Sequence, residues 1–136
     1  MFDYNHYVPI LKAKEGEFGA LSELPEEIRN RISPLIDIFN SDSKIPLELE
    51  KRLIRIANKI ETSWGSDRSI FVDLFGIELK ERVSGGEHPL TFIFDLLRKL
   101  NVKAIPSTGF DRDDAYDKAI EKTVKTDNRG VCIRLL

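Results

Sequence analysis

The chain has 136 residues, of which 41% are hydrophobic and 32% are charged, and its formal net charge is −2. This balance excludes an intrinsically disordered chain, and the lack of a basic excess argues against partners such as nucleic acid or an anionic membrane. No run of about 18 apolar residues occurs, so we expect no transmembrane helix, and the N-terminus lacks the pattern of a secretory signal. A single cysteine, Cys132, excludes an internal disulfide. We therefore expect a cytoplasmic protein with one domain over residues 1–136.

The hydrophobic pattern predicts strands and helices that alternate along the chain. Short apolar runs predict five strands, at residues 7–11, 35–39, 69–75, 102–106 and 131–136. Amphipathic spacing predicts two short helices on either side of Leu24, and longer helices at residues 46–64, 89–100 and 111–125. This order is that of five successive βα units, which predicts an α/β fold with a parallel sheet.

Prolines and glycines suggest where the helices begin and end. Pro25, Pro46 and Pro89 each stand at the start of an amphipathic segment, where a proline is tolerated. The acidic run from Asp111 to Asp117 is typical of a capped helix start with a solvated face. Gly130 is expected to take the left-handed position that ends the last helix.

The last predicted strand, residues 131–136, has no helix after it. An apolar strand in a parallel sheet needs cover, and a closed eight-stranded βα barrel takes about 250 residues. Three interpretations stay open: an open sheet completed by a partner, a half of a (β/α)8 barrel that dimerises, or a truncated barrel without an independent function. The expected partner is a second copy, or another chain, at the edge of the C-terminal strand.

Several segments taken in order resemble one protein family. They are YVPILKAKEGEFGAL, LPEEIRNRISPLIDI, FVDL, IPSTGF and GVCIRLL. Together they are similar to the beta protein family, which is named for a T-even phage beta protein and is found in bacteria and their mobile elements. The matching positions are Tyr7, Pro9, Leu11, Lys12, Lys14, Gly16, Glu17, Ile32, Pro34, Leu35, Asp37, Val72, Asp73, Gly130, Cys132 and Arg134.

The resemblance implies an architecture and a biological setting. Family members are usually much longer, so this chain matches their N-terminal half, and the implied architecture is TIM-barrel-like. The phage and mobile-element setting implies an interaction protein of host–phage conflict. The resemblance implies no reaction, so whether the protein is an enzyme stays open.

Charged residues fall near the carboxyl ends of the predicted strands, where parallel sheets bind ligands. Lys12, Lys14 and Glu17 follow the first strand. Asp37, Asp73 and Arg134 lie within the second, third and fifth strands, and Ser107 and Thr108 follow the fourth. Side chains alternate across a strand, so Lys12, Asp37, Asp73 and Arg134 converge if their sides face a barrel interior.

This pattern supports two interpretations. In the first, an enzyme uses Asp37 and Asp73 as catalytic carboxylates on an anionic or phosphorylated ligand, which Lys12, Lys14, Glu17 and Arg134 bind. In the second, the charges form a buried network that fixes strand register. The carboxylates could also hold a divalent cation, but His6 and His88 lack metal-ligand spacing and are expected in exposed loops. We predict no metal site and no cofactor, and a buried core position for Cys132.

Overall fold

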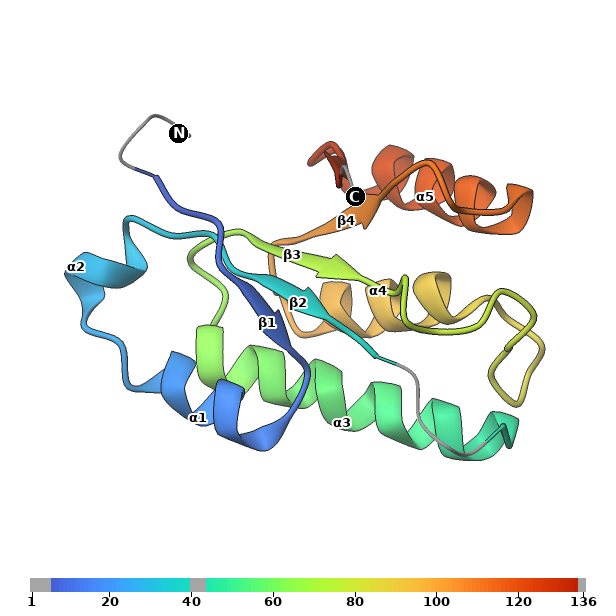
Figure 1. Cartoon of the computed structure of the whole chain (residues 1–136), viewed down its shortest axis with the longest axis horizontal. Helices are drawn as coiled ribbons and strands as arrows, with labels where there is room; N and C mark the ends of the chain where they lie inside the picture. The colour runs from blue at the N-terminus through green and yellow to red at the C-terminus, as the bar shows by residue number, and fades with distance from the viewer. Residues whose placement is uncertain (1–5, 40–43, 135–136) are drawn as a thin grey trace.

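The structure is a computed structural model that describes residues 6–39 and 44–134. Its centre is a five-stranded parallel sheet in which the spatial order of the strands follows the chain (Figure 1). The strands are β1 (Ile10–Lys12), β2 (Leu35–Asp37), β3 (Ile70–Asp73), β4 (Ala104–Thr108) and β5 (Cys132–Ile133). The predicted α/β fold with a parallel sheet is confirmed. The half-barrel architecture stays a prediction.

Helices connect the strands and form one layer. They are α1 (Glu15–Ser22), α2 (Glu26–Arg29), α3 (Pro46–Trp64), α4 (Pro89–Lys99) and α5 (Asp114–Asp127). The long helices contact one another in chain order, α1 with α3, α3 with α4, and α4 with α5. Because the strands are also in chain order, these contacts place the helices side by side along the sheet (Figure 1).

The two faces of the sheet differ in what covers them. Ile36, Val72 and Ala104 point toward the helices and share a core with Leu53 of α3, whose side chain is fully buried. On the other face, Leu35, Phe71 and Ile105 form a smaller apolar cluster, against which Cys132 packs. That smaller cluster contains strand residues alone. Alternation along each strand thus separates a helix-covered core from a second face.

The ends of two helices differ from the prediction. The fourth strand begins at Ala104 rather than at residue 102, because α4 ends in a Schellman motif that includes Asn101 and Val102. Asn101 has a left-handed φ of 61°, and the Val102 amide donates to the Leu97 carbonyl at 3.0 Å. At the end of α5 the residue that caps the helix is Asn128, with a left-handed φ of 56°, since asparagine also tolerates this conformation; Gly130 takes the expected positive φ, 83°, but lies two residues further on.

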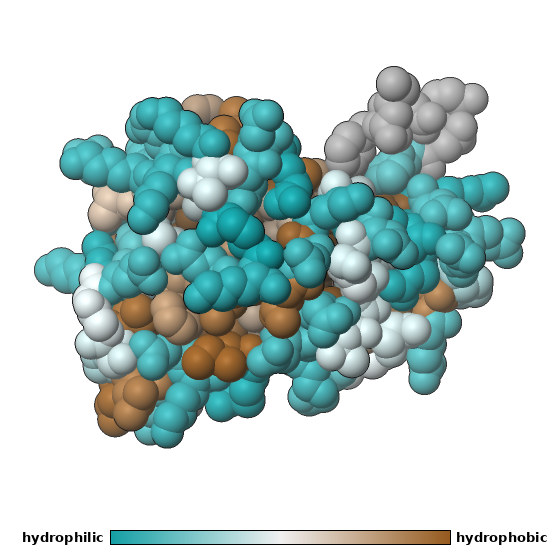
Figure 2. Space-filling model, turned by 180° about the vertical axis from the view of Figure 1, so that it is seen from behind, coloured by the Kyte–Doolittle hydropathy of each residue, from teal (hydrophilic) through white to brown (hydrophobic). Residues whose placement is uncertain are grey.

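The predicted strand at residues 7–11 is also shorter than expected. Tyr7 makes only an isolated bridge to Ile32, and continuous pairing begins at Ile10. Residues 135–136 of the predicted fifth strand lie outside the described residues. No helix within the described part of the chain is long and apolar enough to cross a membrane. Seen from behind, the molecular surface is mostly hydrophilic with small apolar patches (Figure 2).

Candidate functional site

The strand register brings polar side chains together at the carboxyl end of the sheet. Lys12 of β1 pairs with Asp37 of β2, and Asp37 pairs with Asp73 of β3. These residues lie two positions beyond the apolar row of Leu35 and Phe71, so they share its face. The face that the helices leave uncovered therefore carries an apolar row followed by a charged one.

Arg134 joins the two carboxylates. Its Nη1 lies 3.1 Å from Asp73 Oδ2, and its Nη2 lies 3.9 Å from Asp37 Oδ2. Lys12 Nζ lies 3.8 Å from the same Asp37 oxygen. The four charged residues expected to converge thus lie in one ion-pair network. The catalytic and ligand-binding roles predicted for them stay predictions.

Arg112 is the member of the site that sequence reasoning missed. Its Nη1 and Nη2 bind the two oxygens of Asp73 at 2.8 and 3.2 Å, a bidentate pair. Both side chains are almost fully buried, at 1% and 0% exposure. The guanidinium also lies over the rings of Phe75, at 4.4 Å from the centroid, and Tyr116, at 5.0 Å. We call Lys12, Asp37, Asp73, Arg112 and Arg134 the strand-end cluster.

One sequence signal could have pointed to Arg112. It is the only cation in the acidic run from Asp111 to Asp117 that precedes and opens α5. Asp113 of the same run caps that helix by accepting from the Tyr116 amide at 2.9 Å, as the run predicted. A buried carboxylate such as Asp73 needs a cationic partner, and a lone arginine between strand and helix is a candidate for it.

Asp73 is saturated with hydrogen bonds. Besides the two arginines, it accepts from the Phe75 amide at 2.9 Å and from Ser107 Oγ at 3.3 Å. The Tyr116 hydroxyl lies 3.3 Å from its Oδ1. Burial alone would raise the pKa of the Asp73 carboxyl, but the hydrogen bonds and charge of Arg112, with those from Phe75 and Arg134, hold that pKa below its usual range. Asp73 is therefore ionised and fixed in place.

The phenol beside it stays protonated. Burial, reinforced by the charge of Asp73, raises the pKa of Tyr116 above its usual value. Its hydroxyl lies 2.9 Å from the Ser107 carbonyl oxygen, to which it can donate, and accepts from the Leu74 amide at 3.3 Å. Tyr116 thus ties the end of β3 to β4.

Asp37 has a different environment from Asp73. Its side chain is 16% exposed, and its contacts with Lys12 and Arg134 are long, at 3.8 and 3.9 Å. Both contacts are longer than a hydrogen bond, so these two cations hold the Asp37 carboxylate only loosely. Asp37 is therefore the carboxylate of the strand-end cluster that is accessible to a ligand.

A small cavity adjoins the cluster. It has a volume of about 110 Å³ and is lined by Phe75, Gly109, Phe110, Asp111, Arg112 and Arg134. Of the residues that the structure describes, none accepts a hydrogen bond from the buried Nε atoms of Arg112 and Arg134. A Cβ on Gly109 would lie 2.9 Å from the Arg134 carbonyl oxygen and 3.6 Å from Arg112 Nε. Glycine is thus required for this close approach.

Two predicted ligand-binding residues, Lys14 and Glu17, do not join the cluster. Lys14 lines a separate cavity between α1 and α3. Glu17 lies half-buried in α1, and its Oε2 atom has no hydrogen-bond partner among the described residues. Their ligand-binding role also stays a prediction.

Three minor sites differ from expectation. His88 is a half-buried N-cap of α4 rather than an exposed loop residue, and its Nδ1 accepts from the Leu90 amide at 3.1 Å. His6 is half-buried too, with Nε2 2.9 Å from Ser33 Oγ. Cys132 is half-buried rather than a core residue, and burial raises the pKa of its thiol. Among the described side chains, no three His, Cys, Asp or Glu residues are grouped to hold a metal ion.

Comparison with known proteins identifies a family, but no individual curated protein or solved structure. No curated protein matches the chain significantly, and no solved structure does. One family model, described as Beta protein, matches residues 7–136, which is nearly the whole chain. The segments that carry the resemblance include both aspartates and Arg134 of the strand-end cluster. The chain therefore belongs to the beta protein family.

Proposed function

We propose that the strand-end cluster binds a small anionic ligand, of the phosphorylated or carboxylated class. The observation that carries this proposal is the pair of buried arginine Nε atoms, of Arg112 and Arg134, beside one cavity and without acceptors among the described residues. A buried donor without an acceptor is costly, and an oxyanion would satisfy both.

The charge balance supports the same proposal. The cluster holds three cations and two carboxylates, and one of these carboxylates, Asp73, is fully engaged by the protein. Asp111 also lines the cavity, but it is exposed, so solvent screens its charge. The Arg112 side chain is buried and that of Arg134 is 17% exposed, so solvent screens both charges less than it screens Asp111.

We propose different roles for the two aspartates. Asp37, which is accessible and loosely paired, acts as general acid or base if the bound ligand reacts. Asp73 acts as a positioning residue that aligns Arg112 and Arg134, because its oxygens are already committed to the protein.

The test is a titration with inorganic phosphate and with a dicarboxylate, followed by backbone amide NMR shifts. We expect saturable shifts around Phe75, residues 109–112 and Arg134. Arg134→Gln should abolish them, whereas Arg129→Gln, an exposed arginine on the preceding loop, should leave them unchanged. Equal loss in both variants, or no shifts in the wild type, would overturn the proposal.

Catalysis is tested separately from binding. Once an anion is found that binds, Asp37→Asn should abolish turnover while the anion still binds. If Asp37→Asn binds and turns over like the wild type, the acid–base role is refuted and ligand binding alone remains.

We propose association with a partner chain as a second candidate function. β5 lies at the end of the strand order, and Val131 and Ile133 on this edge are exposed, at 41% and 62%. An edge strand offers unpaired backbone groups to another strand. This fits the interaction role in a phage or mobile-element setting that family resemblance implies.

Light scattering on a size-exclusion column tests the association. We expect the mass of a dimer, reduced to that of a monomer by Ile133→Lys. A monomer in the wild type at high concentration would refute self-association.

A further inference from the structure

A second group of cations lies away from the strand-end cluster, around a cavity beside α3. A cavity of about 500 Å³ opens between α1 and α3, within the size range of small-molecule sites. We call it the α1–α3 cavity. Its lining residues are Ala13, Lys14, Glu15, Phe18, Arg52, Arg55, Ile56, Asn58, Lys59 and Thr62.

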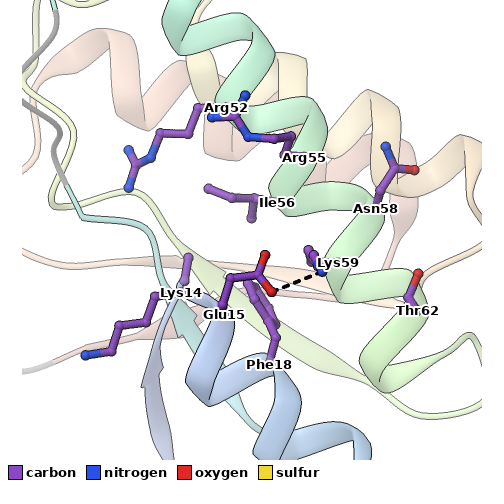
Figure 3. A pocket seen from close by; sticks show the side chains of 10 residues that line it. Lys14, Glu15, Phe18, Arg52, Arg55, Ile56, Asn58, Lys59 and Thr62 are labelled. Atoms are coloured by element: carbon purple, nitrogen blue, oxygen red, sulfur yellow. Dashed lines mark ion pairs between the residues drawn. The ribbon is translucent and has the colours of Figure 1, made fainter.

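The α1–α3 cavity concentrates positive charge in a chain whose net charge is negative. Its lining holds four cations and one carboxylate, Glu15, which pairs with Lys59 at 3.1 Å. Lys14, Arg52 and Arg55 remain in excess. Figure 3 shows the two arginines reaching from α3 above the cavity and Lys14 at the start of α1 below it.

The cations on α3 are placed at an energetic cost to the free protein. Arg52, Arg55 and Lys59 are three and four residues apart, so they lie along one side of the helix. Like charges at this spacing destabilise a helix. A bound anion would offset this repulsion by attracting the cations on both sides of it.

The Arg52 guanidinium is held in place and has donors to offer to an anion. It is held 4.8 Å from the centroid of the Phe39 ring. Among the described residues, neither of its buried Nη atoms has a hydrogen-bond partner. Burial, together with the charge of Arg55, lowers the pKa of Arg52, and Glu81 offsets this only in part. A planar guanidinium with free donors matches a phosphate group.

The floor of the cavity is apolar. Phe18 and Ile56 lie between the cationic sides, and both are buried against the core (Figure 3). A ligand with charged groups at one end and a less polar body at the other would contact both surfaces.

We propose that the α1–α3 cavity binds a phosphorylated small molecule, with Arg52, Arg55 and Lys14 holding the phosphate groups. This site is separate from the strand-end cluster and does not depend on its proposed function. A phosphate group suits it because three excess cations call for more than one negative charge.

The experiment titrates the whole chain with inorganic pyrophosphate and with ADP at physiological ionic strength, again followed by amide NMR shifts. We expect saturable shifts at residues 14–18 and 52–59. Arg52→Gln should raise the dissociation constant at least tenfold. Arg55→Gln, at an exposed position, should raise it severalfold and should leave the unfolding free energy near that of the wild type.

Two controls separate this site from general charge effects and from the other proposal. Lys118→Gln removes an exposed cation from α5 and should leave the shifts at residues 14–18 and 52–59 unchanged. Arg134→Gln in the strand-end cluster should also leave the shifts in these two segments unchanged, whatever its effect around Arg134 itself. Tighter binding of ADP than of pyrophosphate would assign an organic body to the apolar floor, and equal binding would assign the diphosphate group alone. Absence of shifts in both segments, or equal weakening by Arg52→Gln and Lys118→Gln, would overturn the proposal.

Discussion

Replacing Arg112 by methionine tests whether a buried ion pair organises the strand-end cluster. Methionine replaces the apolar stem of the arginine with a side chain of similar length. It removes the guanidinium from Asp73, whose side chain is 0% exposed. Removing one partner of a buried pair costs about 3–5 kcal/mol, because the other charge is left without compensation. Arg134, Ser107 and the Phe75 amide still bind Asp73, so the lower end, about 3 kcal/mol, is expected.

Urea unfolding measures this loss directly. Trp64 is the only tryptophan and is buried, so its fluorescence reports on the core. A loss of about 3 kcal/mol is a large part of the 5–15 kcal/mol typical of a domain and corresponds to a fall in Tm of roughly 10 °C. Arg68→Met is the matched control, since Arg68 pairs with the exposed Glu26 and should cost about 1 kcal/mol or less.

A second variant identifies the cause of the loss. If the cost comes from an uncompensated Asp73 charge, Arg112→Met combined with Asp73→Asn should be more stable than Arg112→Met alone. A cost for Arg112→Met no larger than that for Arg68→Met would show that the buried ion pair does not organise the cluster. If neutralising Asp73 brings no recovery of stability, the Asp73 charge is not the cause of the loss.

Three further predictions concern other parts of the fold. Burial and the charge of Arg82 lower the pKa of His88 to about 4, although the charge of Asp113 acts in the opposite direction. His88 is therefore neutral at neutral pH, and its Nδ1 caps α4. The stability that this cap contributes is present above pH 6.5 and is lost as the pH falls toward 4. His88→Asn keeps a capping oxygen and should flatten the unfolding free energy measured by urea across this range. Gly109→Ala should cost about 1–3 kcal/mol, because its Cβ would lie 2.9 Å from the Arg134 carbonyl oxygen; a variant as stable as wild type in thermal unfolding would contradict that contact. Leu53→Ala should cost about 2–5 kcal/mol in urea unfolding, since Leu53 is fully buried, whereas Ile54→Ala, on the exposed side of α3, should cost much less.

Local patterns in the sequence determined the elements and the sides on which their residues lie. Pro46 and the apolar stripe from Leu49 to Trp64 specify α3 from its first residue to its last, because helix periodicity and proline at the start are short-range effects. Strand alternation likewise placed Asp37 and Asp73 on one face. The family resemblance, spread over the chain, pointed to the family that the comparison shows.

The sequence predicted the ends of strands and the capping residues of helices less accurately than the elements themselves. The start of β4 depends on the Schellman motif at Asn101, and the end of α5 depends on Asn128. Both are asparagines in left-handed conformations, a choice that the sequence leaves open because glycine and asparagine compete for it.

Only the tertiary structure decided that Arg112 belongs to the strand-end cluster. Strand alternation predicted that Arg134 meets Asp73, but Arg112 is 39 residues from Asp73 and lies between β4 and α5, so no strand pattern links it to that carboxylate. The same holds for the α1–α3 cavity, where Lys14 at the start of α1 and Arg52 of α3 line one cavity. Such pairs form because core packing fixes the helices against the sheet, and the desolvation of a carboxylate then favours whichever cation the loops bring within reach.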